Sequence, residues 1–188
     1  MLIIPRYTFD ERVCQTAATA LFRGRRDADG TRVLAKVLLD ESPSPRALAR
    51  LRHEFALETE LDCDEIVRAL ALVELGNSLV LVWRDPGGLP LRQVLDAGRL
   101  PLEQVLRCAA TAVEALQRLH QHHIIHRDLC PENIFVDASA RTVALAGLGI
   151  ASRLSQESQP FSGLSAVEGS PAYLSPEQTG RMNRRTDQ

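Results

Sequence analysis

One of the 22 Lys and Arg side chains in this sequence is a lysine, Lys36, and the others are arginines. A lysine is a compact point charge that suits a single phosphate or carboxylate, whereas an arginine is a wide fork. Lys36 stands in RVLAKVLL (32–39), an apolar run with the length of a buried strand. A buried charge needs a partner because desolvation is costly. The run therefore predicts an anionic partner or ligand at Lys36, or else an edge lysine whose ammonium reaches water.

Histidines crowd the stretch LHQHHIIHRD (119–128), and clustered imidazoles are one pattern that binds metal ions. The histidines concerned are His120, His122, His123 and His126. No cysteine or carboxylate stands at ligand spacing around them, so the pattern favours structural histidines. The four cysteines, at positions 14, 63, 108 and 130, are too widely spaced for a zinc clip. Their spacing is typical of a reduced, cytoplasmic protein.

Two kinds of element must position these residues. Runs rich in β-formers predict strands at 6–13, 20–25, 31–39, 68–74 and 78–83, with a hairpin turn at Asp27–Gly30. A helix follows SPSP (42–45) and runs to about Leu61. After the linker Pro86–Gly88, apolar residues at helical spacing predict a long helix over 102–119, and short strands follow near 134–137 and 142–146. The prediction is an α+β protein with a β-rich first part and a helical second part.

The overall composition fits one domain or one two-lobed unit. The chain has 188 residues, 45% of them hydrophobic, and a net charge of -2. This charge gives no reason to expect nucleic acid or an acidic membrane as a partner. The N-terminus has neither a signal-peptide core nor a cleavage site, and no apolar run reaches the roughly 18 residues that span a bilayer. We therefore expect a cytoplasmic protein.

Four motifs in a fixed order resemble the protein kinase family. HRDLCPEN (126–133) resembles the catalytic loop, VLAK (33–36) resembles the strand that carries the phosphate-binding lysine, and GSPAYLSPE (169–177) resembles the end of the activation segment. Glu54 stands at the spacing of the glutamate that pairs with this lysine. The tail SPEQTGRMNRR (175–185) is similar to bacterial multi-sensor Ser/Thr kinases. The resemblance implies a bilobal fold with an N-lobe at 1–85 and a partial C-lobe at 86–188, which ends before the central C-lobe helix.

The resemblance also implies a role for each matching residue. Asp128 would be the catalytic base, Lys36 would hold ATP phosphates while paired to Glu54, and Asn133 would bind Mg²⁺. Asp128 has a second, structural interpretation, as an acceptor of loop N–H groups. The nucleotide slot would be formed by Lys36, Leu21, Leu34, Val82, Trp83, Asn133 and Phe135. Arg127 would bind a phosphate on the activation segment, where Ser152, Ser155, Ser158, Ser162 and Ser165 are candidates.

The sequence departs from a working kinase at several of these sites. Gly147, in VALAGLGIASRL (143–154), replaces the aspartate that ligates Mg²⁺, so transition-state stabilisation should be lost. The phosphate loop lacks glycine and has Cys14, Thr16 and Thr19 in its key positions. Leu34 and Phe135 should narrow the adenine slot. Glu58 replaces an apolar residue in the helix that carries Glu54, and Cys130 replaces the usual lysine of the catalytic loop.

These departures predict a pseudokinase that binds a protein partner or adjacent domains of a longer chain. An active ATP-dependent Ser/Thr kinase that uses Asp128 is the alternative, and it would need a replacement metal ligand such as Glu168 or Asp137. A small-molecule phosphotransferase shares the loop, but GSPAYLSPE argues against it. Because the sequence stops before the central helix, the second lobe should expose an apolar face. The basic cluster RMNRR (181–185) is weak evidence for phosphate binding.

Overall fold

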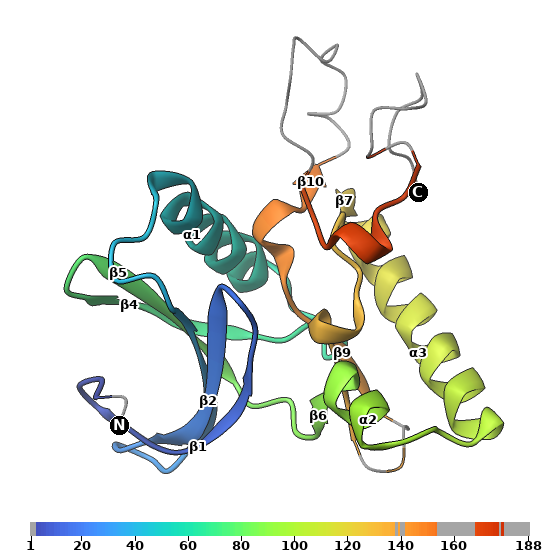
Figure 1. Cartoon of the computed structure of the whole chain (residues 1–188), viewed down its shortest axis with the longest axis horizontal. Coiled ribbons are helices and arrows are strands. Elements are labelled where there is room, and N and C mark those ends of the chain that lie inside the picture. Colours follow the sequence, from blue (N-terminus) through green and yellow to red (C-terminus); the bar gives the residue numbers. More distant parts are fainter. Residues whose placement is uncertain (1–2, 138, 140–141, 154–167, 177, 179–188) are drawn as a thin grey trace, which may run out of the picture.

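The computed structural model describes residues 3–137, 139, 142–153, 168–176 and 178 (Figure 1). Four of the candidate phosphorylation sites, Glu177 and the RMNRR cluster lie outside the described residues. Those four sites are Ser155, Ser158, Ser162 and Ser165. Within the described part of the chain, no helix is long and apolar enough to cross a membrane.

The first lobe is a five-stranded antiparallel sheet in the order β1-β2-β3-β5-β4. Its strands are β1 (Tyr7–Gln15), β2 (Thr19–Arg26), β3 (Arg32–Leu38), β4 (Ala69–Leu75) and β5 (Ser78–Arg84). Because side chains alternate along a strand, Leu34 and Lys36 of β3 share one face with Leu21 and Trp83, which stand opposite them in the register. Val82 lies on the other face, where it packs in a separate apolar cluster.

Helix α1 (Pro45–Glu60) packs beside this sheet in Figure 1. Ser44 caps its start by accepting a hydrogen bond from Ala47 N at 3.2 Å, and Pro45 occupies the first turn, where a missing N–H costs nothing. Leu51 and Leu57 supply its buried apolar contacts, but two glutamates, Glu54 and Glu58, are buried with them. The inward side of α1 is therefore partly charged.

The second lobe is built around the long helix α3 (Leu102–Gln121). Its other elements are β6 (Leu89–Pro90), α2 (Leu91–Ala97), β7 (Ile124–Ile125), β8 (Ile134–Val136), β9 (Val143–Leu145) and β10 (Ser152–Arg153). Strands β6, β8 and β9 form one small sheet, and β7 pairs with β10. The predicted α+β fold, with a β-rich first lobe and a helical second lobe, is confirmed.

The face that α3 buries differs from the one that its large apolar residues suggest. The buried residues are Cys108, Ala112, Ala115 and Leu119. Leu102, Leu106 and Val113 are instead 72%, 61% and 63% exposed. Small side chains allow the helix to approach the strands closely, so they face the core. The large residues make the apolar exposed face that the sequence predicts for this lobe.

The segment that connects the two lobes, residues 85–88, makes close contacts with both of them. Arg23 of β2 donates from Nε to Asp85 Oδ2 at 2.9 Å and from a terminal nitrogen to the carbonyl oxygen of Gly88 at 2.6 Å. Gly88 has a φ of 69°, and a Cβ there would lie 2.0 Å from the carbonyl oxygen of Val136 in β8. Only glycine fits this close approach. The connection is thus fixed to the first lobe by Arg23 and to the second by Gly88.

Candidate functional site

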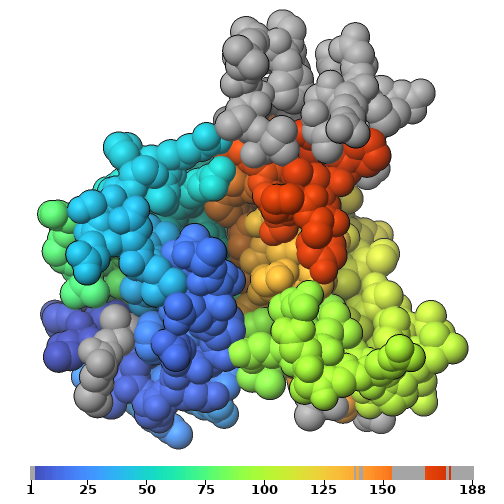
Figure 2. Space-filling model, viewed as in Figure 1, coloured from blue at the N-terminus to red at the C-terminus, as the bar shows by residue number. Residues whose placement is uncertain are grey.

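A cavity of about 610 Å³ lies between the two lobes, where Figure 2 shows a hollow between the blue N-terminal strands and the red segment that contains the short helix η4 (Pro171–Tyr173). Lys36 and Glu54 line it from the first lobe, and Asp128, Asn133 and Gly147 line it from the second. Residues that are up to 111 positions apart in the sequence therefore meet in one place. The sequence predicted this grouping through the kinase-like motifs.

The predicted pairing of Lys36 with Glu54 is present. The Nζ of Lys36 lies 2.9 and 2.8 Å from the two carboxylate oxygens of Glu54, and it also lies 5.4 Å from the centre of the Trp83 ring. The Glu54 side chain is only 2% exposed and that of Lys36 is 17% exposed. A buried carboxylate with a bidentate cation is held firmly, because losing the partner would leave an uncompensated charge. The alternative of an unpaired edge lysine is excluded by these distances.

Asp128 is already bound by groups of its own chain. One carboxylate oxygen accepts the N–H of Ser170 at 2.8 Å, and the other accepts Asn133 Nδ2 at 3.1 Å. The same Nδ2 donates to the Asp128 carbonyl oxygen at 2.8 Å. The neighbouring His126 is buried and its Nε2 lies 3.0 Å from the Ala146 carbonyl oxygen; burial lowers the pKa of this imidazole. These bonds fit the structural interpretation of Asp128, and they leave its carboxylate in the cavity.

Gly147 is buried in the left-handed conformation, with a φ of 86° and a ψ of 37°. A Cβ at this position would lie 2.5 Å from both Cγ and Oδ1 of Asn133. Mg²⁺ requires near-octahedral oxygen ligands, and Gly147 supplies no side-chain oxygen. No group of three or more His, Cys, Asp or Glu side chains in the described ranges could hold a metal ion. The residues present do not fit a bound Mg²⁺.

Neither proposed replacement ligand lines the cavity. Glu168 is held by Arg46 and Arg50 of α1. Asp137 lies beyond β8, where it accepts Ser139 Oγ at 2.5 Å and Thr142 N at 3.0 Å. Both carboxylates therefore have partners away from Asn133.

Five of the seven predicted slot residues line the cavity: Leu21, Lys36, Trp83, Asn133 and Phe135. Leu34 lies behind them, completely buried in the same apolar cluster as Trp83 and Phe135. Val82 does not belong to the slot, because strand alternation turns it to the opposite face of the sheet. Side chains from both lobes thus share one core cluster at this end of the cavity. The narrowing of the slot by Leu34 and Phe135 stays a prediction.

In the turn that would cover the phosphates, two backbone N–H groups already donate hydrogen bonds to a side chain of the same turn. Thr16 Oγ1 accepts the N–H groups of Ala18 at 3.2 Å and of Thr19 at 3.0 Å. A phosphate would have to compete with this hydroxyl for both donors. The loop departs from a phosphate-binding loop in its hydrogen bonding as well as in its lack of glycine.

Glu58 forms a contact that the sequence did not predict. It is buried, and its Oε2 accepts Trp83 Nε1 at 2.6 Å, while its Oε1 has no hydrogen-bond partner among the described residues. Burial and the nearby Glu54 carboxylate raise the pKa of Glu58 well above its ordinary value. A neutral carboxyl group can occupy this apolar position, which explains how the helix tolerates it.

Arg50 also lines the cavity, although no role there was predicted for it, and Cys14 and Cys130 line it at two of the positions where the sequence departs from a kinase. Burial raises the pKa of both thiols, so they stay protonated at neutral pH. The signal for Arg50 was its spacing, four residues before Glu54, which places both on one side of a helix.

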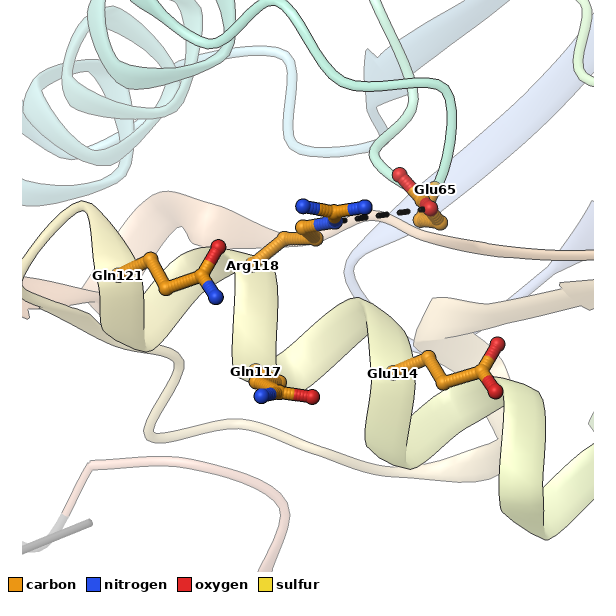
Figure 3. A pocket seen from close by; sticks show the side chains of 5 residues that line it. All are labelled: Glu65, Glu114, Gln117, Arg118 and Gln121. Atoms are coloured by element: carbon orange, nitrogen blue, oxygen red, sulfur yellow. Dashed lines mark ion pairs between the residues drawn. The ribbon is translucent and has the colours of Figure 1, made fainter.

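A second, smaller hollow of about 250 Å³ lies against the outside of α3 (Figure 3). Its side chains are Glu65, Glu114, Gln117, Arg118 and Gln121. Arg118 Nε lies 3.9 Å from Glu65 Oε1, which joins α3 to the segment before β4. Four of these polar residues are exposed and Glu65 is half-buried, which indicates a solvated surface, so the interlobe cavity is the stronger candidate site.

Comparison with known proteins agrees with the motifs. The family model described as "Protein kinase domain" matches residues 7–188. The chain is 32% identical to serine/threonine-protein kinase pkn2 of Myxococcus xanthus, over 89% of this chain and 21% of that protein. It is 31% identical to serine/threonine-protein kinase 36 of Pongo abelii, over 92% of this chain and 13% of that protein. The chain thus spans about a fifth or less of the length of these two relatives.

Proposed function

The chain belongs to the protein kinase family, and we propose that this domain acts by binding, with phosphoryl transfer impaired or lost. The observation that carries the proposal is Gly147, which offers no metal-binding oxygen and whose missing side chain leaves space that Asn133 occupies. Family members generally use Mg²⁺ to neutralise the transferred phosphoryl group, so its loss should remove several kcal/mol of transition-state stabilisation. Lys36 remains suited to phosphate, and weak ATP binding is compatible with this role.

Asp128 supports the proposal through its hydrogen bonds. Because Ser170 and Asn133 both donate to its carboxylate, Asp128 stabilises the loop and the segment that returns to it. This gives a reason for the residue to persist without catalysis. The remaining members of the site, Lys36 and Glu54, likewise form a buried ion pair that supports the first lobe.

We propose that the partner is a protein surface or an adjacent domain of a longer chain. The exposed Leu102, Leu106 and Val113 of α3 form an apolar face of the kind that proteins cover by association. The relatives are several times longer than this chain, which favours an adjacent domain. The four cysteines are all free, which favours the cytoplasm as the compartment.

An active Ser/Thr kinase remains the alternative, and the intact Lys36–Glu54 pair beside Asp128 is the observation in its favour. Two measurements separate the proposals. Thermal melting with Mg·ATP should shift the midpoint by less than a few degrees, and any shift should disappear in Lys36→Ala. Incubation with radiolabelled ATP and a protein substrate should transfer no label. Label that is transferred by the parent and lost in Asp128→Ala would establish the active enzyme instead.

A further inference from the structure

Helix α1 presents four charged residues to the rest of the molecule at a regular spacing of four. They are Arg46, Arg50, Glu54 and Glu58. This spacing places them along one side of the helix. Their partners come from three different places: Glu168 directly before GSPAYLSPE (169–177), Lys36 in β3 and Trp83 in β5. The position of α1 therefore depends on polar contacts at each of its turns.

The two arginines converge on one oxygen. Arg46 and Arg50 both donate to Glu168 Oε1, with Arg50 at 2.8 Å. Burial and the neighbouring Arg46 lower the pKa of Arg50, which reports the repulsion between the two guanidinium groups. A carboxylate between them offsets this repulsion. The Glu168 side chain is 27% exposed, so the triad is partly screened from water.

Glu168 is also joined closely to the catalytic loop. Two residues on, the N–H of Ser170 donates to Asp128 at 2.8 Å. The short stretch Glu168–Ser170 thus connects α1 at one end to Asp128 at the other. Ala151, which stands earlier in the chain, makes a second connection to α1, because its carbonyl oxygen lies 2.8 Å from His53 Nε2.

We propose that Glu168 is a positioning residue that holds α1 where Glu54 can pair with Lys36, without a phosphate group on the chain. Removing its charge would leave Arg46 and Arg50 facing each other and would release the first turns of α1. Glu54 lies one turn beyond Arg50 on the same side of the helix, so its pairing with Lys36 would weaken. The inference concerns conformation, and it stands whether or not the domain transfers phosphate.

The single lysine provides a specific assay. An acetylating reagent such as N-hydroxysuccinimide acetate modifies amines, and Lys36 and the N-terminus are the only ones in the sequence. Peptide mass spectrometry separates the two products. We expect Glu168→Gln to accelerate Lys36 acetylation about two- to fivefold, within the range that the loss of a partly exposed ion pair allows. Glu168→Asp, which keeps the charge, should restore most of the protection. Glu103→Gln removes an ion pair on α3 and should have no effect.

A double variant, compared with its two single variants, tests whether Glu168 acts through Glu54. Glu54→Gln breaks the pair directly and sets the fastest rate, so adding Glu168→Gln to it should cause no further acceleration. Arg46→Gln removes one of the two donors and should give a smaller rise, which provides a second variant if Glu168→Gln folds poorly. Phosphatase treatment of the parent should leave the rate unchanged. An unchanged rate in Glu168→Gln, equal acceleration in both backgrounds, or acceleration by phosphatase would each overturn the proposal.

Discussion

Replacing Gly147 with aspartate restores the family's acid, and the structure predicts that this single change destabilises the domain. The backbone at Gly147 has a φ of 86°, a conformation that costs an L-residue about 1–2 kcal/mol. The conformational cost for aspartate is at the lower end of this range, because aspartate tolerates the left-handed region better than most residues do. The new Cβ would also lie 2.5 Å from Asn133 Cγ, and such overpacking costs about 1–3 kcal/mol. We expect a total loss of about 2–4 kcal/mol in the free energy of unfolding.

Urea unfolding of the parent, Gly147→Asp and Gly147→Ala measures this loss. The alanine variant has the same Cβ and no carboxylate, so it should lose at least as much stability as the aspartate variant, because alanine tolerates the left-handed region less well. Adding Asn133→Ala to Gly147→Asp removes the contact and should recover part of the overpacking cost. A Gly147→Asp protein as stable as the parent would refute the steric reasoning.

The same two variants test the metal argument. If the missing oxygen is what prevents Mg²⁺ binding, Mg·ATP should stabilise Gly147→Asp more than Gly147→Ala. Equal responses of the two variants would show that another departure, such as Phe135 in the predicted adenine slot, limits binding on its own.

Three other substitutions give simpler tests. Because the pKa of Glu58 is raised in the folded state, its contribution to stability is present at low pH and is lost as the pH rises from about 4.3 towards the folded-state pKa, at up to about 1.4 kcal/mol per pH unit. The difference in unfolding free energy between parent and Glu58→Gln should follow this slope, and a flat difference would contradict the assignment. Lys36→Ala leaves Glu54 buried and unpaired, so it should cost about 3–5 kcal/mol by urea unfolding, and a loss below about 1 kcal/mol would show that the pair contributes little. Phe135→Val should cost about 1–3 kcal/mol of stability but widen the slot, so ATP should raise the melting midpoint more than in the parent, and an unchanged response would exclude Phe135 as the obstruction.

Regular elements were predictable from the sequence because their signals are local. Strand β3 spans Arg32–Leu38 where a strand was predicted at 31–39, and α1 begins at Pro45 as its cap residues indicate. Helix α2 was missed, since its seven residues are too few for a clear period. The buried side of α3 was predicted incompletely, because its small residues, which the strands approach, carry less hydrophobic signal than the exposed leucines.

The candidate site was predictable only as far as the family resemblance extends. The meeting of Lys36 with Glu54 followed from that resemblance. The position of Val82 could have been corrected from strand alternation alone, since Val82 and Trp83 are adjacent and must face opposite ways. The contact between Arg50 and Glu168 spans 118 residues, and no local pattern identifies it. Contacts of this kind depend on how the lobes are arranged.

The fixed connection between the lobes determines how the cavity can open. Arg23 and Gly88 fasten the chain to both lobes at one side of the interface, near β6 in Figure 1, whereas α1 lies at the other side. Any rotation of one lobe relative to the other would use this fixed connection as its hinge. The displacement would then be greatest at the Arg46 and Arg50 contacts with Glu168, which lie far from this hinge. These contacts would therefore be the first to break when the lobes separate.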